Sequence, residues 1–109
     1  EYKVNENEYN RCVDELMLQI EDSIEDSLVD IDCENSNGIL TLTVETNGSQ
    51  IILSRQAASR EVWLAARSGG FHFVLKDSIW RDTKTDETLD NRLQQAVKLQ
   101  AGEFVDFNL

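Results

Sequence analysis

Seven carboxylates stand close together between Gln19 and Glu34, a stretch without any basic residue: Glu21, Asp22, Glu25, Asp26, Asp30, Asp32 and Glu34. Clustered carboxylates are hard oxygen ligands that suit divalent or trivalent cations. The stretch has no EF-hand spacing and no nearby histidine, so its residue types predict weak, shallow and multiple cation sites. A charge run of this kind is more often an ordinary solvated face, and that alternative stays open on residue types alone.

The charge of the chain is concentrated in its first half. The formal net charge is −11, with 13 acids and 2 bases in residues 1–54 against 8 acids and 8 bases in residues 55–109. Such a field repels nucleic acid and anionic membranes, and it attracts cations and basic protein surfaces. No apolar run is long enough to span a membrane, and no secretion signal is visible. We therefore expect a cytoplasmic protein, with Cys12 and Cys33 as reduced thiols.

Two helices are predicted, one at each end of the chain. Apolar residues recur at helical spacing near the start: Tyr9, Val13, Leu16, Met17, Ile20, Ile24 and Leu28. This spacing predicts an amphipathic helix over residues 6–28 whose acids face away from the core, although Leu18 falls among the acids. A second helix is predicted from Asp86, capped by Thr85 or Asp86 and ending near Gly102.

Short alternating segments between these helices predict five or six hairpin-linked strands, separated by turns such as Asn35–Gly38 and Thr46–Ser49. Two helices that flank such a series would cover a single face of the sheet. The expected fold is α+β, a two-layer αβ sandwich with two helices packed on one face of an antiparallel sheet of five to seven strands. Residues 1–109 are expected to form a single domain.

One aromatic residue is predicted on the uncovered face of the sheet. If Val62 and Leu64 face the core, the alternation places Trp63 on the opposite face, and the same parity places His72 there too. A large aromatic side chain on a solvated sheet face is a candidate anchor for a protein partner. The alternative is that Arg55 or the following loop covers it.

No pattern of residues indicates catalysis. The one histidine, His72, has no obvious nucleophile partner, and the chain contains no phosphate-binding loop, G-x-S-x-G or H-E-x-x-H motif. We expect that the protein is not an enzyme.

The segment SRQAASREVWLAARSGGFHF, residues 54–73, resembles the frataxin family in its bacterial CyaY-type branch. The family pattern is close to N-[RK]-Q, a spacer, [QH]-[IV]-W-L-A and G-G-Y-H-F. The matching residues are Arg55, Gln56, Val62, Trp63, Leu64, Ala65, Gly69, Gly70, His72 and Phe73. DIDCENSNGILTLT and QQAVKLQAGE resemble further family segments, so the resemblance covers nearly the whole chain. Ser54 replaces the usual asparagine, and Ala57 and Ala58 stand where a proline is common, which bears on partner contacts.

The resemblance implies a protein of iron–sulfur cluster assembly that binds iron, as Fe2+ or Fe3+, weakly, with other divalent or trivalent cations as substitutes. It implies two partners, a cysteine desulfurase and the iron–sulfur scaffold protein. The family's acidic ridge falls on the seven carboxylates between Glu21 and Glu34, and we call these seven residues the acidic ridge. Partner contacts are expected from Glu21, Asp22, Glu25, Arg55, Gln56 and Trp63. A monomer is expected, with oligomerisation under excess iron left open.

Two functions of different classes stay open. The protein could feed or guard iron during cluster assembly, or it could be a regulatory module that docks on the desulfurase, with metal secondary. Metal binding requires a few close carboxylates, so Glu21, Asp22 and Glu25 would dominate it. Docking requires summed charge and an anchor such as Trp63, and it should weaken with salt.

Overall fold

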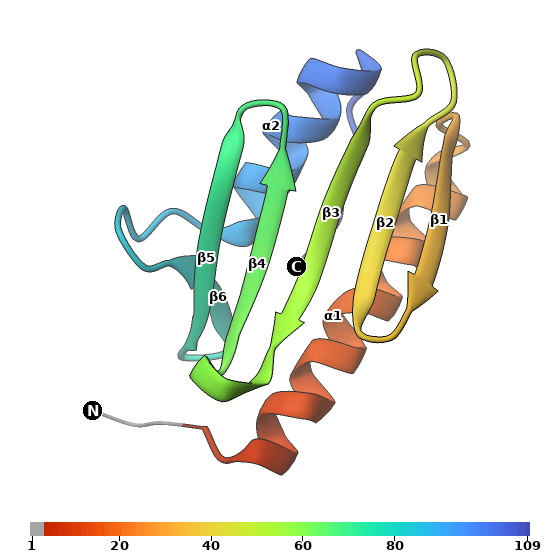
Figure 1. Ribbon diagram of the computed structural model, residues 1–109. Helices are drawn as coiled ribbons and strands as arrows, with labels where there is room; N and C mark the ends of the chain where they lie inside the picture. The colour runs from red at the N-terminus through yellow and green to blue at the C-terminus, as the bar shows by residue number, and fades with distance from the viewer. Residues whose placement is uncertain (1–3) are drawn as a thin grey trace.

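The alternating segments in the middle of the chain form six antiparallel strands that pair in sequence order, as the computed structural model of residues 4–109 shows (Figure 1). The strands are β1 (Ile31–Ser36), β2 (Ile39–Val44), β3 (Gln50–Gln56), β4 (Glu61–Ala66), β5 (Gly69–Lys76) and β6 (Ile79–Asp82). A short 3-10 helix, Ala57–Ser59, joins β3 to β4. The predicted two-layer sandwich is confirmed.

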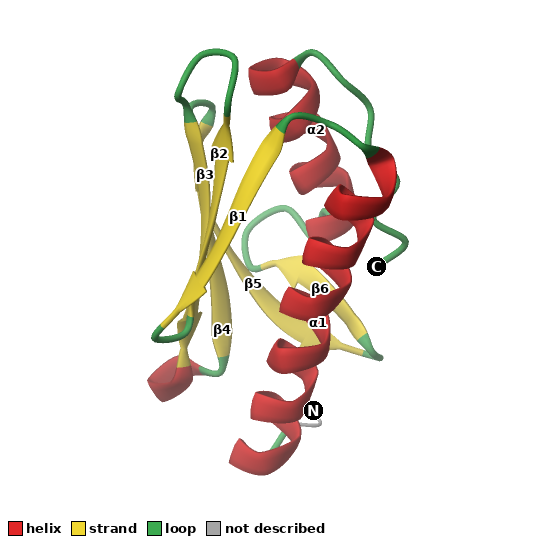
Figure 2. Cartoon of the chain, turned by 90° about the vertical axis from the view of Figure 1, so that its right-hand side faces the viewer, coloured by secondary structure: helices red, strands yellow, loops and turns green. Residues whose placement is uncertain are grey.

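Two helices, α1 (Glu6–Ser27) and α2 (Leu89–Ala101), cover the same face of this sheet (Figure 2). The core lies between the helices and the inward side chains of the strands, such as Leu42, Leu53 and Val62. The opposite face of the sheet carries no α-helix from residues 4–109, and we call it the open face. Neither helix within residues 4–109 has the length and apolar character to cross a membrane.

The start of α1 follows the usual rules for helix capping. The side chain of Asn5 accepts a hydrogen bond from the backbone N–H of Glu8 at 2.8 Å, which satisfies one of the free donors of the first turn. Within the helix, Tyr9, Val13 and Ile20 are fully buried, as their spacing predicts. The helix ends at Ser27, one residue before the predicted boundary.

The predicted cap of the second helix is wrong. Thr88 is the N-cap, since its side chain accepts a hydrogen bond from the N–H of Asn91 at 3.1 Å. The preceding residues stay in a loop because the Asp82 carboxylate accepts hydrogen bonds from the N–H groups of Lys84 and Thr85 at 2.7 and 3.2 Å. The helix ends at Gly102, as predicted, and this glycine has a left-handed conformation.

The segment after α2 returns to the helical layer. Val105 and Phe107 are buried in the core, and the carbonyl oxygen of Phe107 accepts hydrogen bonds from Gln19 and Ser23 of α1. The C-terminal segment therefore connects α1 to the core through these hydrogen bonds and through its two buried side chains.

Candidate functional site

The acidic ridge begins on the second half of α1, where the helix itself gains nothing from it. Glu25 and Asp26 lie in the last turn, which carries no basic residue, so their charges oppose the helix dipole. In contrast, α2 has Asp90 in its first turn and Lys98 in its last turn, which is the favourable arrangement. The acids at the end of α1 are therefore not explained by helix stability.

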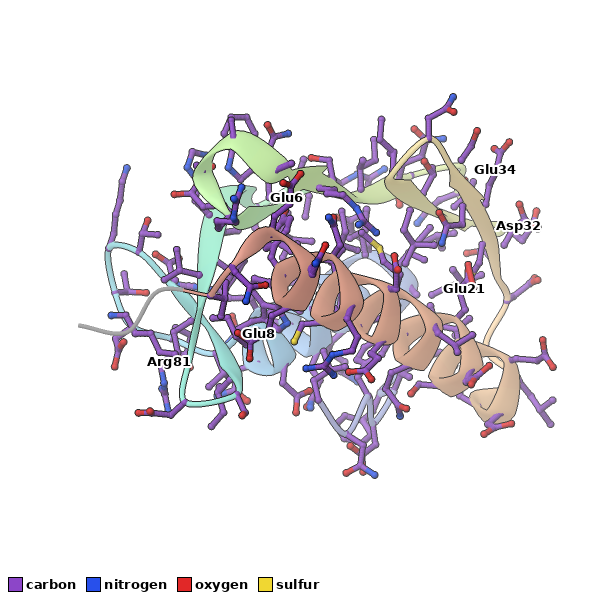
Figure 3. All side chains as sticks on the ribbon, turned by 90° about the horizontal axis from the view of Figure 1, so that it is seen from below. Glu6, Glu8, Glu21, Asp32, Glu34 and Arg81 are labelled. Carbon is purple, nitrogen blue, oxygen red and sulfur yellow. The ribbon has the colours of Figure 1, made fainter. Side chains whose placement is uncertain are left out.

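The fold brings part of the acidic ridge together around Cys33 of β1. The pKa of the Cys33 thiol is raised from its ordinary value of 9.0 to about 11, first by burial and then by the negative charges of Glu21, Asp32 and Glu25. Cys33 points toward the helical layer, while Asp32 and Glu34 point to the open face. In Figure 3, Glu21 extends from α1 toward β1, which carries Asp32 and Glu34.

Two other acids of the acidic ridge, Asp22 and Asp26, do not belong to this group. Because successive residues of a helix are rotated by about 100°, Asp22 and Asp26 lie on a different row of α1 from Glu21 and Glu25. Asp22 and Asp26 are exposed, and neither is among the charges that act on Cys33. The acidic ridge is thus a curved surface around the α1–β1 edge.

None of the seven acids has an ion-pair partner within residues 4–109. The acids that do form ion pairs there lie elsewhere, for example Asp14 with Arg55 and Glu15 with Arg11. Residues 4–109 therefore leave the negative charge of the acidic ridge unneutralised, and this charge is available to an external cation or a basic surface.

Carboxylates of the acidic ridge do not converge into a preformed cage. Among the residues that the structure describes, no group of three or more His, Cys, Asp or Glu side chains is placed to hold a metal ion. A cation would meet separate carboxylates with much of its water retained, which suits weak binding of a hard cation.

Trp63 lies on the open face, as predicted, and its side chain is held in place from two sides. Its ring stacks on His72 with ring centroids 4.3 Å apart and an interplanar angle of 7°. Its indole N–H donates a hydrogen bond to Glu61 Oε1 at 2.7 Å. The indole is 38% exposed, so it presents a fixed apolar surface to solvent.

The alternative that Arg55 covers Trp63 is wrong. Arg55 is in register with Val62, so its side chain points to the helical layer, where it donates hydrogen bonds to Asn10, at 2.6 Å, and to Asp14. These contacts hold the first half of α1 against β3. Gln56 is partly exposed and donates a hydrogen bond to Ser54 at 3.4 Å. Partner contacts by Arg55 and Gln56 stay predictions.

Two features of this surface were not predicted from the residue pattern: the stack of His72 on Trp63 and the hydrogen bond that Trp63 donates to Glu61. Strand parity places all three on the open face, but the contacts depend on the register of β4 with its neighbours. Trp63 pairs with His72 in β5 and with Ser54 in β3. The sequence does hold a signal for the hydrogen bond: Trp63, whose indole has an N–H group, follows the acid Glu61 by two residues in the same strand. Side chains two residues apart in a strand share a face.

A groove of about 570 Å3 lies apart from these surfaces, between α1, the β5–β6 turn and the C-terminal segment. Cys12, Leu75, Trp80 and Leu109 are among its lining residues. No residue of the acidic ridge lines it, and neither does Trp63.

Comparisons with known proteins agree on one family. The frataxin-like domain matches residues 2–103 of this chain. The chain is 46% identical over 106 residues to the iron-sulfur cluster assembly protein CyaY of Pseudomonas aeruginosa, a match that covers 95% of this chain and 97% of that protein.

Solved structures show the same architecture. Frataxin from Psychromonas ingrahamii superimposes with a TM-score of 0.89 at 33% identity, covering 95% of this chain and 98% of that one. Trimeric frataxin from the yeast Saccharomyces cerevisiae, complexed with ferrous iron, superimposes with a TM-score of 0.68 at 25% identity, covering 94% and 91%.

Proposed function

Because this chain belongs to the frataxin-like family, we propose that it acts in iron–sulfur cluster assembly, binds iron weakly on the acidic ridge and modulates a cysteine desulfurase. The observation that carries the proposal is that none of the seven acids is neutralised by an ion pair within residues 4–109. Iron is the cargo of such a protein, and no catalytic role is assigned to any residue.

The lack of a converging carboxylate group among residues 4–109 supports weak iron binding. Glu21 and Glu25 are the best-placed acids, since they are neighbours one turn apart on the surface of α1. A cation that binds the native protein alone stabilises it by RT ln(1 + [L]/Kd), about 2.7 kcal/mol at a hundredfold excess over Kd. Saturating iron(II) or cobalt(II) should therefore raise the melting temperature. An unchanged melting temperature would contradict iron binding by the folded protein.

A second candidate function is a docking module that regulates the desulfurase without metal. The fixed, exposed indole of Trp63 favours it, because a side chain already held in one conformation loses little entropy on binding. Trp63 stands on β4, three strands along the open face from Asp32 and Glu34 of β1. A partner that contacts both would have to bind across about 15 Å of sheet.

The two candidates differ in their need for metal, and desulfurase binding measured by interferometry separates them. The variants are Glu21→Lys/Asp22→Lys and Trp63→Ala, each with and without iron(II). Glu103→Lys/Asp106→Lys is the matched control, because it changes the net charge equally at exposed acids outside the acidic ridge.

Docking predicts binding without metal that both test variants weaken and the control largely preserves. Iron-dependent action predicts binding only with iron(II), which the variant of the acidic ridge abolishes and Trp63→Ala leaves intact. If the control weakened binding as strongly as Glu21→Lys/Asp22→Lys, net charge rather than the acidic ridge would be responsible.

A further inference from the structure

Leu18 is exposed in the middle of a helix that buries its other apolar side chains. It is 58% exposed, whereas Leu16, Met17 and Ile20 on either side are buried. At about 100° per residue, Leu18 lies on the side of α1 opposite to Ile20. The packing of α1 on the sheet therefore gives no reason for a leucine at this position.

Acids occupy all four positions that neighbour Leu18 on the helix surface. Asp14 and Glu15 lie one turn before it, and Glu21 and Asp22 lie one turn after it. The side chain is thus an apolar knob within a ring of carboxylates. An apolar centre surrounded by a polar rim is a common arrangement in protein interfaces.

Leu28, at the end of the same helix, is a second and independent case. It is 89% exposed, and its backbone has a left-handed conformation with φ 61°. This position normally favours glycine, because a Cβ disfavours the left-handed region. Leu28 follows Glu25 and Asp26 and precedes Asp30, so this apolar side chain also lies among acids of the acidic ridge.

We propose that Leu18 and Leu28 are the apolar anchors of the docking surface, and that they fit a basic protein surface with apolar recesses rimmed by Arg or Lys. A leucine side chain has no atom that can coordinate a cation, so iron binding does not explain either residue. A second copy of this chain is a poor occupant, since a symmetric contact would oppose acid to acid. The inference rests on the docking function proposed above and adds to it what the partner must offer besides positive charge.

Two variants test the anchors without altering charge. Leu18→Gln keeps helix propensity, and Leu28→Gly removes the side chain while relieving the left-handed backbone. Leu99→Gln on α2 is the matched control: Leu99 is 73% exposed, but its neighbours one turn earlier on the helix surface, Gln95 and Ala96, are not acids. Each test variant should weaken desulfurase binding about tenfold, chiefly through faster dissociation, and Leu99→Gln should not. The melting temperature of Leu28→Gly should be unchanged or higher, which separates lost binding from misfolding.

A pair of synthetic peptides tests the same inference without the desulfurase. One alternates Lys and Leu at helical spacing, and the other has Gln in place of Leu at the same length and charge. The wild-type protein should prefer the Lys/Leu peptide, and Leu18→Gln should lose this preference while binding the Lys/Gln peptide unchanged. Equal affinity of the wild-type protein for both peptides would overturn the inference.

If wild-type protein preferred the Lys/Leu peptide but did not bind the desulfurase, the choice of partner would be wrong and the anchors would stand. Desulfurase binding that both leucine variants left intact would overturn the anchors and leave the docking function standing.

Discussion

Replacing Tyr9 with phenylalanine should destabilise the protein by about 2–3 kcal/mol, because one hydroxyl connects α1 to two strands. Tyr9 Oη donates a hydrogen bond to the carbonyl oxygen of Glu61 at 2.6 Å and accepts one from the N–H of Gln56 at 3.0 Å. These two backbone groups flank the connection between β3 and β4. Tyr9 is fully buried, and its ring packs edge-on against Trp80 at 6.2 Å.

The magnitude follows from what phenylalanine leaves unpaired. The ring, its volume and its contact with Trp80 are retained, so only the hydroxyl is tested. A buried backbone group that loses its partner costs about 1–3 kcal/mol, and two groups lose theirs. Because water can reach the end of a strand, we expect a total loss of about 2–3 kcal/mol rather than twice the largest cost for a single group. The melting temperature should fall by an amount on the order of 10 °C.

Urea unfolding of wild type and Tyr9→Phe measures this difference. Thr43→Val on the open face is the control, since it also removes a hydroxyl but one in an exposed, 3.4 Å hydrogen bond, and it should change stability by less than about 0.5 kcal/mol. A change that small for Tyr9→Phe would refute the idea that this hydroxyl holds α1 to the β3–β4 connection.

The pH dependence gives the same prediction a second test. Burial is the main reason that the pKa of Tyr9 is raised above its ordinary value of 10.0. The unfolded chain therefore loses the phenolic proton first, and the stability that depends on a neutral Tyr9 falls as the pH rises above 10. Tyr9→Phe lacks this loss, so the gap in stability between the two proteins should narrow above pH 10.

Two further predictions concern Cys33 and Gln100. Glu21→Gln should lower the raised pKa of the Cys33 thiol, so a thiol reagent should modify Cys33 faster at pH 8.5 in a Cys12→Ser background; an unchanged rate would mean that the Glu21 charge does not act there. Gln100→Met should destabilise the protein by about 1–3 kcal/mol in urea unfolding, because the buried Gln100 side chain accepts a hydrogen bond from the N–H of Arg67 at 2.9 Å; a loss below about 0.5 kcal/mol would mean that water satisfies this group instead.

Local alternation in the sequence was sufficient to predict which face each strand residue occupies. Successive side chains of a strand point to opposite faces, so Val62 and Trp63 could be assigned without knowledge of the neighbouring strands. Helical spacing was sufficient for most of α1, where the predicted apolar residues from Tyr9 to Ile24 are buried. The prediction was wrong for Leu28, which is 89% exposed because the helix ends at Ser27. The exposed position of Leu18 was also apparent, because helix geometry is local.

The start of α2 could not be predicted because contacts distant in sequence decide it. Thr85 and Asp86 are acceptable caps by residue type, and nothing local excludes them. Hydrogen bonds to Asp82 and a bridge between Arg81 and Thr88 hold the intervening residues in a loop. The helix can begin only after that bridge, at Leu89.

The sequence by itself determined that the first half of the chain is strongly acidic and that its acids recur at helical spacing. Only the tertiary structure decided which of them act together. The charges of Glu21 on α1 and Asp32 on β1 both act on the Cys33 thiol because β1 packs beside α1. Asp22, the neighbour of Glu21, faces elsewhere because the helix turns by about 100° at each residue. Composition sets how much charge a surface can carry, but packing sets where that charge is concentrated.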